Sequence, residues 1–141
     1  MIRLAAIDHV VFRVKDMAAM IRWYGEVLGA GVEREVPDVG LVQLRAGASL
    51  IDLVDVAGRL GRQGGAAPGE GGRNVDHVCL RVEPWDGEAI LAHLAGHGIA
   101  NAEIASRYGA QGQGPSIYIA DPEGNVLELK GPPWPSDDDL G

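Results

Sequence analysis

The sequence IDHVVFRV at residues 7–14 returns as VDHVCLRV at residues 75–82, 68 positions further along the chain. Five of the eight positions are identical, and they include the Asp-His pair and the Arg. Polar and apolar residues alternate in both stretches, as in a β-strand whose successive side chains point to opposite faces. His9 and His77 occupy the same place in the two strands. The repeat therefore predicts a duplicated unit in which each half lends one imidazole to a shared site.

The same order of elements is predicted after each repeat. An amphipathic helical pattern follows Asp16 and ends at Gly29, and a shorter pattern follows Asp86 and ends near Gly96. Three further strands are expected after each helix, at residues 32–36, 41–45 and 49–54, and again at residues 103–107, 115–120 and 125–130. Each half is therefore predicted to be a β-α-β-β-β module, and the chain is expected to be an α+β protein with two mixed sheets.

The chain of 141 residues, 46% of them hydrophobic, suits a single globular domain with modules at residues 1–57 and 75–131. Seven glycines fall within residues 58–74, which predicts a flexible linker between the modules. Residues 132–141 contain Pro-Pro-Trp-Pro and three aspartates and are expected to form an irregular C-terminal arm.

The net charge of −8 argues against a nucleic-acid partner, which would favour a basic face. No apolar run approaches the roughly 20 residues that a bilayer-spanning helix needs, and the N-terminus shows no secretion-signal pattern. We therefore expect a cytoplasmic protein with no membrane partner. The single cysteine, Cys79, excludes an internal disulfide and a multi-cysteine zinc site.

Strand alternation also predicts which side chains gather around the two histidines. In the last strand of each half, alternate Ile and Leu side chains are expected to face the core, so Asp52 and Glu128 project from the other face. That face is the one that His9 and His77 share. The same alternation places four further residues there as candidate substrate-binding groups: Gln43, Arg45, Ser116 and Tyr118.

Two imidazoles and two carboxylates form a donor set that suits Zn²⁺, Ni²⁺, Mn²⁺ or Fe²⁺. We predict His9, His77 and Glu128 as ligands of a divalent metal. Asp52 is a candidate fourth ligand, although its side chain is one methylene shorter than that of Glu. A metal held in this way can polarise a carbonyl, acidify a bound water or hold a substrate through two oxygens. The structural alternative is that each His only packs on a half-buried strand.

The residues also resemble a known family, the vicinal oxygen chelate superfamily, which includes glyoxalase I, methylmalonyl-CoA epimerase, extradiol dioxygenases, fosfomycin-modifying enzymes and bleomycin-binding proteins. The resemblance covers residues 7–131. Its carriers are the two DHV motifs, WYGEVLG at residues 23–29 and DPEGNVLE at residues 121–128. It implies paired modules whose sheets curve into a cup around a divalent metal, commonly in homodimers.

Under this resemblance, His9, His77 and Glu128 match the ligand positions of the superfamily. Asp52 matches a fourth position that glyoxalase-like members fill with Glu. Ser116 and Tyr118 match positions that line the substrate pocket of fosfomycin-modifying members. The sequence contains no convincing set of glutathione-binding residues.

The function favoured by these observations is that of a metal-dependent lyase or isomerase that transfers a proton beside the carbonyl of a small substrate chelated through adjacent oxygens. Glu128 or Asp52 is the expected general base. Three alternatives stay open: an extradiol-type Fe(II) dioxygenase, a fosfomycin-type thiol transferase, and a non-enzymatic drug-binding protein like the bleomycin binders. The sequence leaves open whether the site forms within one chain or between two.

Overall fold

The structure is a computed structural model that describes residues 1–135, and it divides the chain into two compact units. Unit 1 comprises residues 1–74, and unit 2 begins at Val75. Unit 1 contains β1 (His9–Val14), α1 (Met17–Leu28), β2 (Val32–Val36), η1 (Pro37–Val39), β3 (Leu41–Ala46), β4 (Ser49–Asp55) and η2 (Gly61–Gly64). Unit 2 contains β5 (Val78–Arg81), α2 (Gly87–Gly96), β6 (Ala105–Gly109), β7 (Gly112–Ala120) and β8 (Val126–Lys130).

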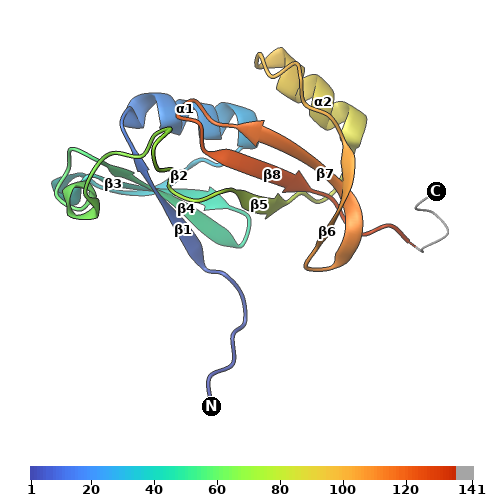
Figure 1. Cartoon of the computed structure of the whole chain (residues 1–141), viewed down its shortest axis with the longest axis horizontal. Helices are drawn as coiled ribbons and strands as arrows, with labels where there is room; N and C mark the ends of the chain where they lie inside the picture. The colour runs from blue at the N-terminus through green and yellow to red at the C-terminus, as the bar shows by residue number, and fades with distance from the viewer. Residues whose placement is uncertain (136–141) are drawn as a thin grey trace. The chain divides into compact units, whose positions relative to one another are not determined.

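Each unit forms a four-stranded mixed sheet, with the order β1-β4-β3-β2 in unit 1 and β5-β8-β7-β6 in unit 2. The first and last strands of each unit pair in parallel, and the other neighbours pair antiparallel. Figure 1 shows the strands of each unit side by side, with the helix of that unit on one side of its sheet. The predicted α+β fold with two β-α-β-β-β modules is therefore confirmed.

Both helices begin and end at the residues that the sequence indicates. The Asp16 side chain accepts a hydrogen bond from the backbone N–H of Ala19, and Asp86 accepts one from Ala89, each at 3.1 Å. Such caps satisfy backbone donors that have no partner within the helix. Gly29 follows α1 in the left-handed conformation, with φ of 67°, which costs a glycine little.

The apolar face of each sheet is buried as the alternation predicts, and two carboxylates on the opposite face are buried as well. Phe12, Leu53 and Leu127 are fully buried. Asp52 and Glu128 lie on the opposite faces of β4 and β8, yet they are only 5% and 6% exposed. The reason is that β4 and β8 are interior strands, so a neighbouring strand flanks each of them on both sides.

Several strand boundaries in unit 2 differ from the prediction. β5 begins at Val78, so His77 precedes the strand instead of lying within it. The β6–β7 ladder continues to the pair Gly109↔Gly112, and both strands therefore reach further into the hairpin than the apolar pattern shows. Glycine carries no apolar signal, which is why the pattern ends early at this hairpin.

The glycine-rich segment at residues 58–74 is attached to the end of β1 in unit 1. The guanidinium of Arg13 donates hydrogen bonds to the carbonyl oxygens of Gly61, Ala66 and Gly65 at 3.2, 3.1 and 2.7 Å. The side chain of Asn74 bonds to the backbone N–H and C=O of the same Arg13. One side chain therefore orders much of a segment for which composition predicts only flexibility.

The described part of the C-terminal arm, residues 132–135, forms no helix or strand. The backbone N–H of Trp134 donates to Gln113 O at 2.8 Å, and its indole N–H donates to Ser106 Oγ at 2.9 Å. The remainder of the predicted arm, residues 136–141, lies outside the described residues. Across residues 1–135, no helix is both long and apolar enough to cross a membrane.

Candidate functional site

In unit 1, His9 faces a buried carboxylate on the neighbouring strand. His9 begins β1, and Asp52 lies on β4, where its Cα pairs with that of Val11. The His9 Nε2 atom is 4.0 Å from Asp52 Oδ2, and its Nδ1 atom is 2.7 Å from Asp8 Oδ1. The hydrogen bond to Asp8, helped by the negative charge of Asp52, raises the pKa of His9. The imidazole is thus held with one nitrogen toward Asp8 and the other toward Asp52.

Unit 2 repeats this arrangement with a glutamate. His77 Nδ1 is 2.7 Å from Asp76 Oδ1, and His77 Nε2 is 3.4 Å from Glu128 Oε1. The shared pattern extends from the Asp-His dipeptide to the carboxylate on the last strand. Histidines that bind metals commonly donate their second ring N–H to a carboxylate, which fixes the ring and leaves the other nitrogen for the metal. Both histidines have that second partner.

A hydrogen-bonded turn fixes the start of β8 and thus the place of Glu128. One oxygen of Asp121 accepts from the backbone N–H groups of Glu123 and Asn125 at 2.9 and 3.0 Å, and the other accepts from the Asn125 side chain at 2.8 Å. Gly124 adopts φ of 83°, a conformation that favours glycine. The DPEGN sequence therefore defines where the strand that bears Glu128 begins.

The carboxylate of Asp52 has a second neighbour in unit 1. The side-chain amide of Gln43, its Cα partner on β3, lies 3.2 Å from both oxygens of Asp52 and donates to them. Arg34 on β2 donates to the Gln43 carbonyl oxygen at 3.0 Å, which turns the amide N–H₂ toward Asp52. Gln43, predicted as a substrate-binding residue, therefore positions Asp52 in this structure.

The residue at the matching place in unit 2 is Tyr118, the Cα partner of Glu128 on β7. Its ring packs edge-on against the His77 ring, with 5.3 Å between centroids. Burial, the charge of Glu128 and a hydrogen bond to Glu128 raise the pKa of the Tyr118 hydroxyl. Tyr118 therefore lies directly beside the His77–Glu128 pair, as the sequence predicts.

The other two predicted substrate-binding residues already have partners within the protein. Arg45 is half exposed and forms an ion pair with Glu33 through Nε and Nη2. Ser116 is fully buried, and its Oγ accepts a hydrogen bond from Arg107 Nη1 at 2.7 Å. Arg34 and Arg107, which contact Gln43 and Ser116, were missed by the sequence analysis, because their roles depend on strand pairing alone.

The paired donors fit a divalent cation in their chemistry. Each unit brings together one imidazole nitrogen and one buried carboxylate, the ligand types that suit Zn²⁺, Ni²⁺, Mn²⁺ or Fe²⁺. An ionised carboxylate is costly to bury unless it is compensated by hydrogen bonds or positive charge. Among residues 1–135, no group of three or more His, Cys, Asp or Glu side chains lies close enough together to hold a metal ion. In each unit the structure brings two candidate donors together, one histidine and one carboxylate.

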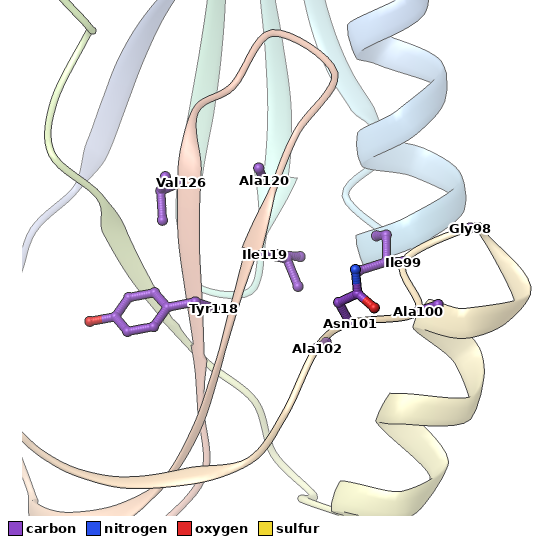
Figure 2. A pocket seen from close by; sticks show the side chains of 9 residues that line it. All are labelled: Gly98, Ile99, Ala100, Asn101, Ala102, Tyr118, Ile119, Ala120 and Val126. Atoms are coloured by element: carbon purple, nitrogen blue, oxygen red, sulfur yellow. The ribbon is translucent and has the colours of Figure 1, made fainter.

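A pocket of about 470 Å³ lies elsewhere in unit 2, between the segment at residues 98–102 and the end of β7. Ile99, Ala102 and Ile119 give it a largely apolar lining, with Asn101 as a polar group. Figure 2 shows the Tyr118 ring on the opposite side of β7 from the Ile119 and Asn101 side chains. Tyr118 also lines the pocket, so the residue whose ring packs against His77 contributes to it as well.

Comparison with known proteins identifies relatives of the whole chain. The sequence model of the Glyoxalase/Bleomycin resistance protein/Dioxygenase superfamily matches residues 6–129. A virulence protein of Salmonella typhimurium, STM3117, is 29% identical over 128 residues, which cover 87% of this chain and 81% of that protein.

Solved structures agree with this assignment. The crystal structure of the Salmonella typhimurium virulence protein matches with a TM-score of 0.74 and 26% identity, covering 93% of this chain and 99% of the other. A lactoylglutathione lyase from Agrobacterium tumefaciens matches with a TM-score of 0.63 and 18% identity, covering 91% and 94%. At that level of identity the second likeness concerns the fold alone.

Proposed function

This chain belongs to the glyoxalase/bleomycin resistance protein/dioxygenase superfamily, and we propose that it is a divalent-metal-dependent lyase or isomerase. Its substrate is a small molecule that presents two adjacent oxygens to the metal. The proposed ligands are His9 and Asp52 of unit 1 and His77 and Glu128 of unit 2. They come from one chain or from two chains of a homodimer, a form that members of the superfamily often adopt.

The repeated His–carboxylate arrangement is the observation that supports this proposal. In both units the histidine Nδ1 lies 2.7 Å from the preceding aspartate, and Nε2 faces a carboxylate that is more than nine-tenths buried. A histidine that only packs on a strand does not require a carboxylate beside each of its ring nitrogens. Both copies of the duplicated unit keep this arrangement, which favours a shared purpose for the two pairs.

The bound metal would polarise the substrate carbonyl and stabilise the negative charge that develops there. The residues of the chain supply orientation and proton transfer. Asp8 and Asp76 hold the two imidazoles in a fixed tautomer and direction. Glu128 is the proposed base that removes the proton from the carbon beside the carbonyl, because its longer side chain has more reach than Asp52, which the Gln43 amide restrains.

Metal analysis of the purified protein tests the proposal. We expect one divalent ion per site and loss of that ion in His9→Ala and in His77→Ala. His93→Ala is the matched control, because His93 lies exposed on α2. Retention of stoichiometric metal in both His9→Ala and His77→Ala would refute the site. We expect the metal-depleted protein to regain activity when zinc or nickel is added. The activity to measure is proton exchange on a hydroxy-carbonyl compound.

A second candidate is an extradiol-type dioxygenase that uses Fe²⁺. The contact between Gln43 and Asp52 favours it, since an Asp52 held by an amide at 3.2 Å leaves a set of two histidines and Glu128. Two histidines and one carboxylate form the common ligand triad of such iron enzymes. Oxygen uptake with catechols under iron loading, without activity under zinc or nickel, would select this candidate over proton transfer.

A further inference from the structure

Arg107 in unit 2 carries a guanidinium that is positioned but not neutralised. It is half buried, and among residues 1–135 no carboxylate forms an ion pair with it. Within the same residues only Nη1 donates a hydrogen bond, to the Oγ and the carbonyl oxygen of Ser116 at 2.7 and 3.3 Å. An arginine offers five N–H donors in a planar fork that fits carboxylates and phosphates. Most of that fork is left for a ligand.

One contact holds this guanidinium in place, and another holds the backbone of Arg107. Its central carbon lies 4.3 Å from the centroid of the Tyr118 ring, a cation–π contact. The buried ammonium of Lys130 donates to the backbone carbonyl of Arg107 at 2.6 Å and to that of Gly114 at 3.1 Å. The strand that bears Arg107 is thereby tied to β8, the strand of Glu128. A ligand would meet a group that is already oriented.

The position of Arg107 relates it to the proposed metal ligands. The Tyr118 ring contacts the Arg107 guanidinium and also packs against the His77 ring at 5.3 Å between centroids. One aromatic ring therefore separates the guanidinium from the His77–Glu128 pair. A small substrate held at that pair can reach Arg107 with a second group of its own.

The charges on this face point in the same direction. Strand pairing places Arg81, Arg107 and Lys130 on the face that bears Glu128. Within the described residues none of the three cations is ion-paired with a carboxylate, although the chain as a whole has a net charge of −8. Three cations and one buried carboxylate on the same face favour an anion there.

Unit 1 supplies the contrast. There Arg34 donates to Gln43 at 3.0 Å, and Arg45 is paired with both oxygens of Glu33. The arginines that flank the Asp52 carboxylate are therefore used within the protein. In the part of the chain that the structure describes, Arg107 has no acidic partner of this kind.

We propose that Arg107 forms a subsite for an oxyanion group of the substrate, a carboxylate, phosphonate or phosphate that lies beside the oxygens bound at the His77–Glu128 pair. This inference rests on the proposed function for the reacting end of the substrate. Tyr118 and Ser116 position the guanidinium, and the oxyanion accepts hydrogen bonds from its remaining N–H groups. Neutral analogues would bind more weakly because they offer no charged acceptor to the remaining N–H groups of the guanidinium.

The test is an NMR titration of the full-length, metal-free protein with sodium phosphate and, separately, with sodium acetate. Amide signals of residues 105–118 report binding, and the tighter of the two anions identifies the oxyanion class. We expect Arg107→Gln to weaken that binding at least about tenfold, as for loss of a bidentate charged pair. Arg107→Lys keeps the positive charge but lacks the planar guanidinium, so its anion affinity should lie between those of wild type and Arg107→Gln. Arg22→Gln, with the same change of charge on an exposed part of α1, should bind as the wild type does.

Binding of neither anion, or equal binding by wild type and Arg107→Gln, would overturn the inference. Glu128→Gln separates it from the proposed function: this variant should lose the metal and bind the anion as well as or better than wild type, because a nearby negative charge is removed. Loss of metal in Glu128→Gln together with unchanged anion binding in Arg107→Gln would leave the metal site standing and remove the subsite. Retention of metal in Glu128→Gln together with weaker anion binding in Arg107→Gln would remove the metal site and leave the subsite standing.

Discussion

In unit 1 the Asp52 carboxylate is held by the Gln43 amide at 3.2 Å, whereas in unit 2 the Glu128 carboxylate lies beside Tyr118 and 3.4 Å from His77. The backbone register around the two carboxylates is the same, with Gln43 opposite Asp52 and Tyr118 opposite Glu128. The two modules therefore share the backbone positions of the carboxylate and its cross-strand neighbour, but the side chains at these positions differ.

The difference suggests a division of roles between the units. An amide that donates to both oxygens restrains a carboxylate, and an arginine behind the amide strengthens the restraint. A phenol ring leaves the longer Glu128 more freedom and brings Arg107 close by. We therefore expect unit 1 to contribute a fixed ligand pair and unit 2 to contribute the groups that meet the substrate.

The sharpest test of this division compares Glu128→Gln with Asp52→Asn. Loss of a partner that only orients a ligand commonly lowers metal affinity by about 10- to 100-fold, so loss of Glu128 as a direct ligand should lower it by about 100-fold or more. Asp52→Asn should cost about tenfold, because Gln43 already holds its oxygens. Competition with a chromophoric chelator measures both affinities. Equal losses would show that the two carboxylates serve the metal alike.

A second comparison concerns stability. Gln43→Leu removes the donor to the buried Asp52 and the acceptor for Arg34, so it should lower the free energy of unfolding by about 1–3 kcal/mol. Tyr118→Phe removes one hydroxyl and keeps the ring contacts, so the expected loss is about 0.5–1.5 kcal/mol. Urea unfolding of both variants provides the values. A larger loss in Tyr118→Phe would reverse the roles assigned to the units.

The smallest expected effect is the pH dependence of the Glu33–Arg45 pair, which has no counterpart among the described residues of unit 2. The hydrogen bond from Arg45 lowers the pKa of Glu33 in the folded protein. A carboxyl whose folded pKa is depressed stabilises the fold above its ordinary pKa of about 4.3 and loses that contribution as the pH falls through the folded pKa. The stability difference between wild type and Glu33→Gln should therefore be small at neutral pH and vanish in acid. Urea midpoints measured across that range test this, and a difference that grows toward low pH would contradict it.

Much of the fold could be predicted because local chemistry carries it. Asp16 and Gly29 mark the ends of α1, and the DPEGN turn marks the start of β8, through contacts made within a few residues. Alternation along β8 likewise places the Glu128 side chain on the other face of the strand from those of Leu127 and Leu129. Short-range rules of this kind need no knowledge of distant partners.

The partners of the predicted site residues could not be obtained in this way. The side-chain amide of Gln43, predicted as a substrate-binding residue, donates to Asp52, and the Oγ of buried Ser116 accepts a hydrogen bond from Arg107. Arg13 donates to three carbonyl oxygens of the glycine-rich segment and thereby orders it. Composition alone predicts a flexible chain there. Each of these contacts joins residues brought together by strand pairing or chain reversal.

The sequence by itself determined the duplicated strand–helix–strand order, the two Asp-His pairs and the carboxylates at matching places in the last strand of each half, because periodicity and capping act over a few neighbouring residues. Only the tertiary structure decided which of those carboxylates an amide restrains and that Arg107 has no acidic partner among residues 1–135. Hydrogen bonds across strands depend on sheet register and side-chain reach, and neither is written in the local pattern.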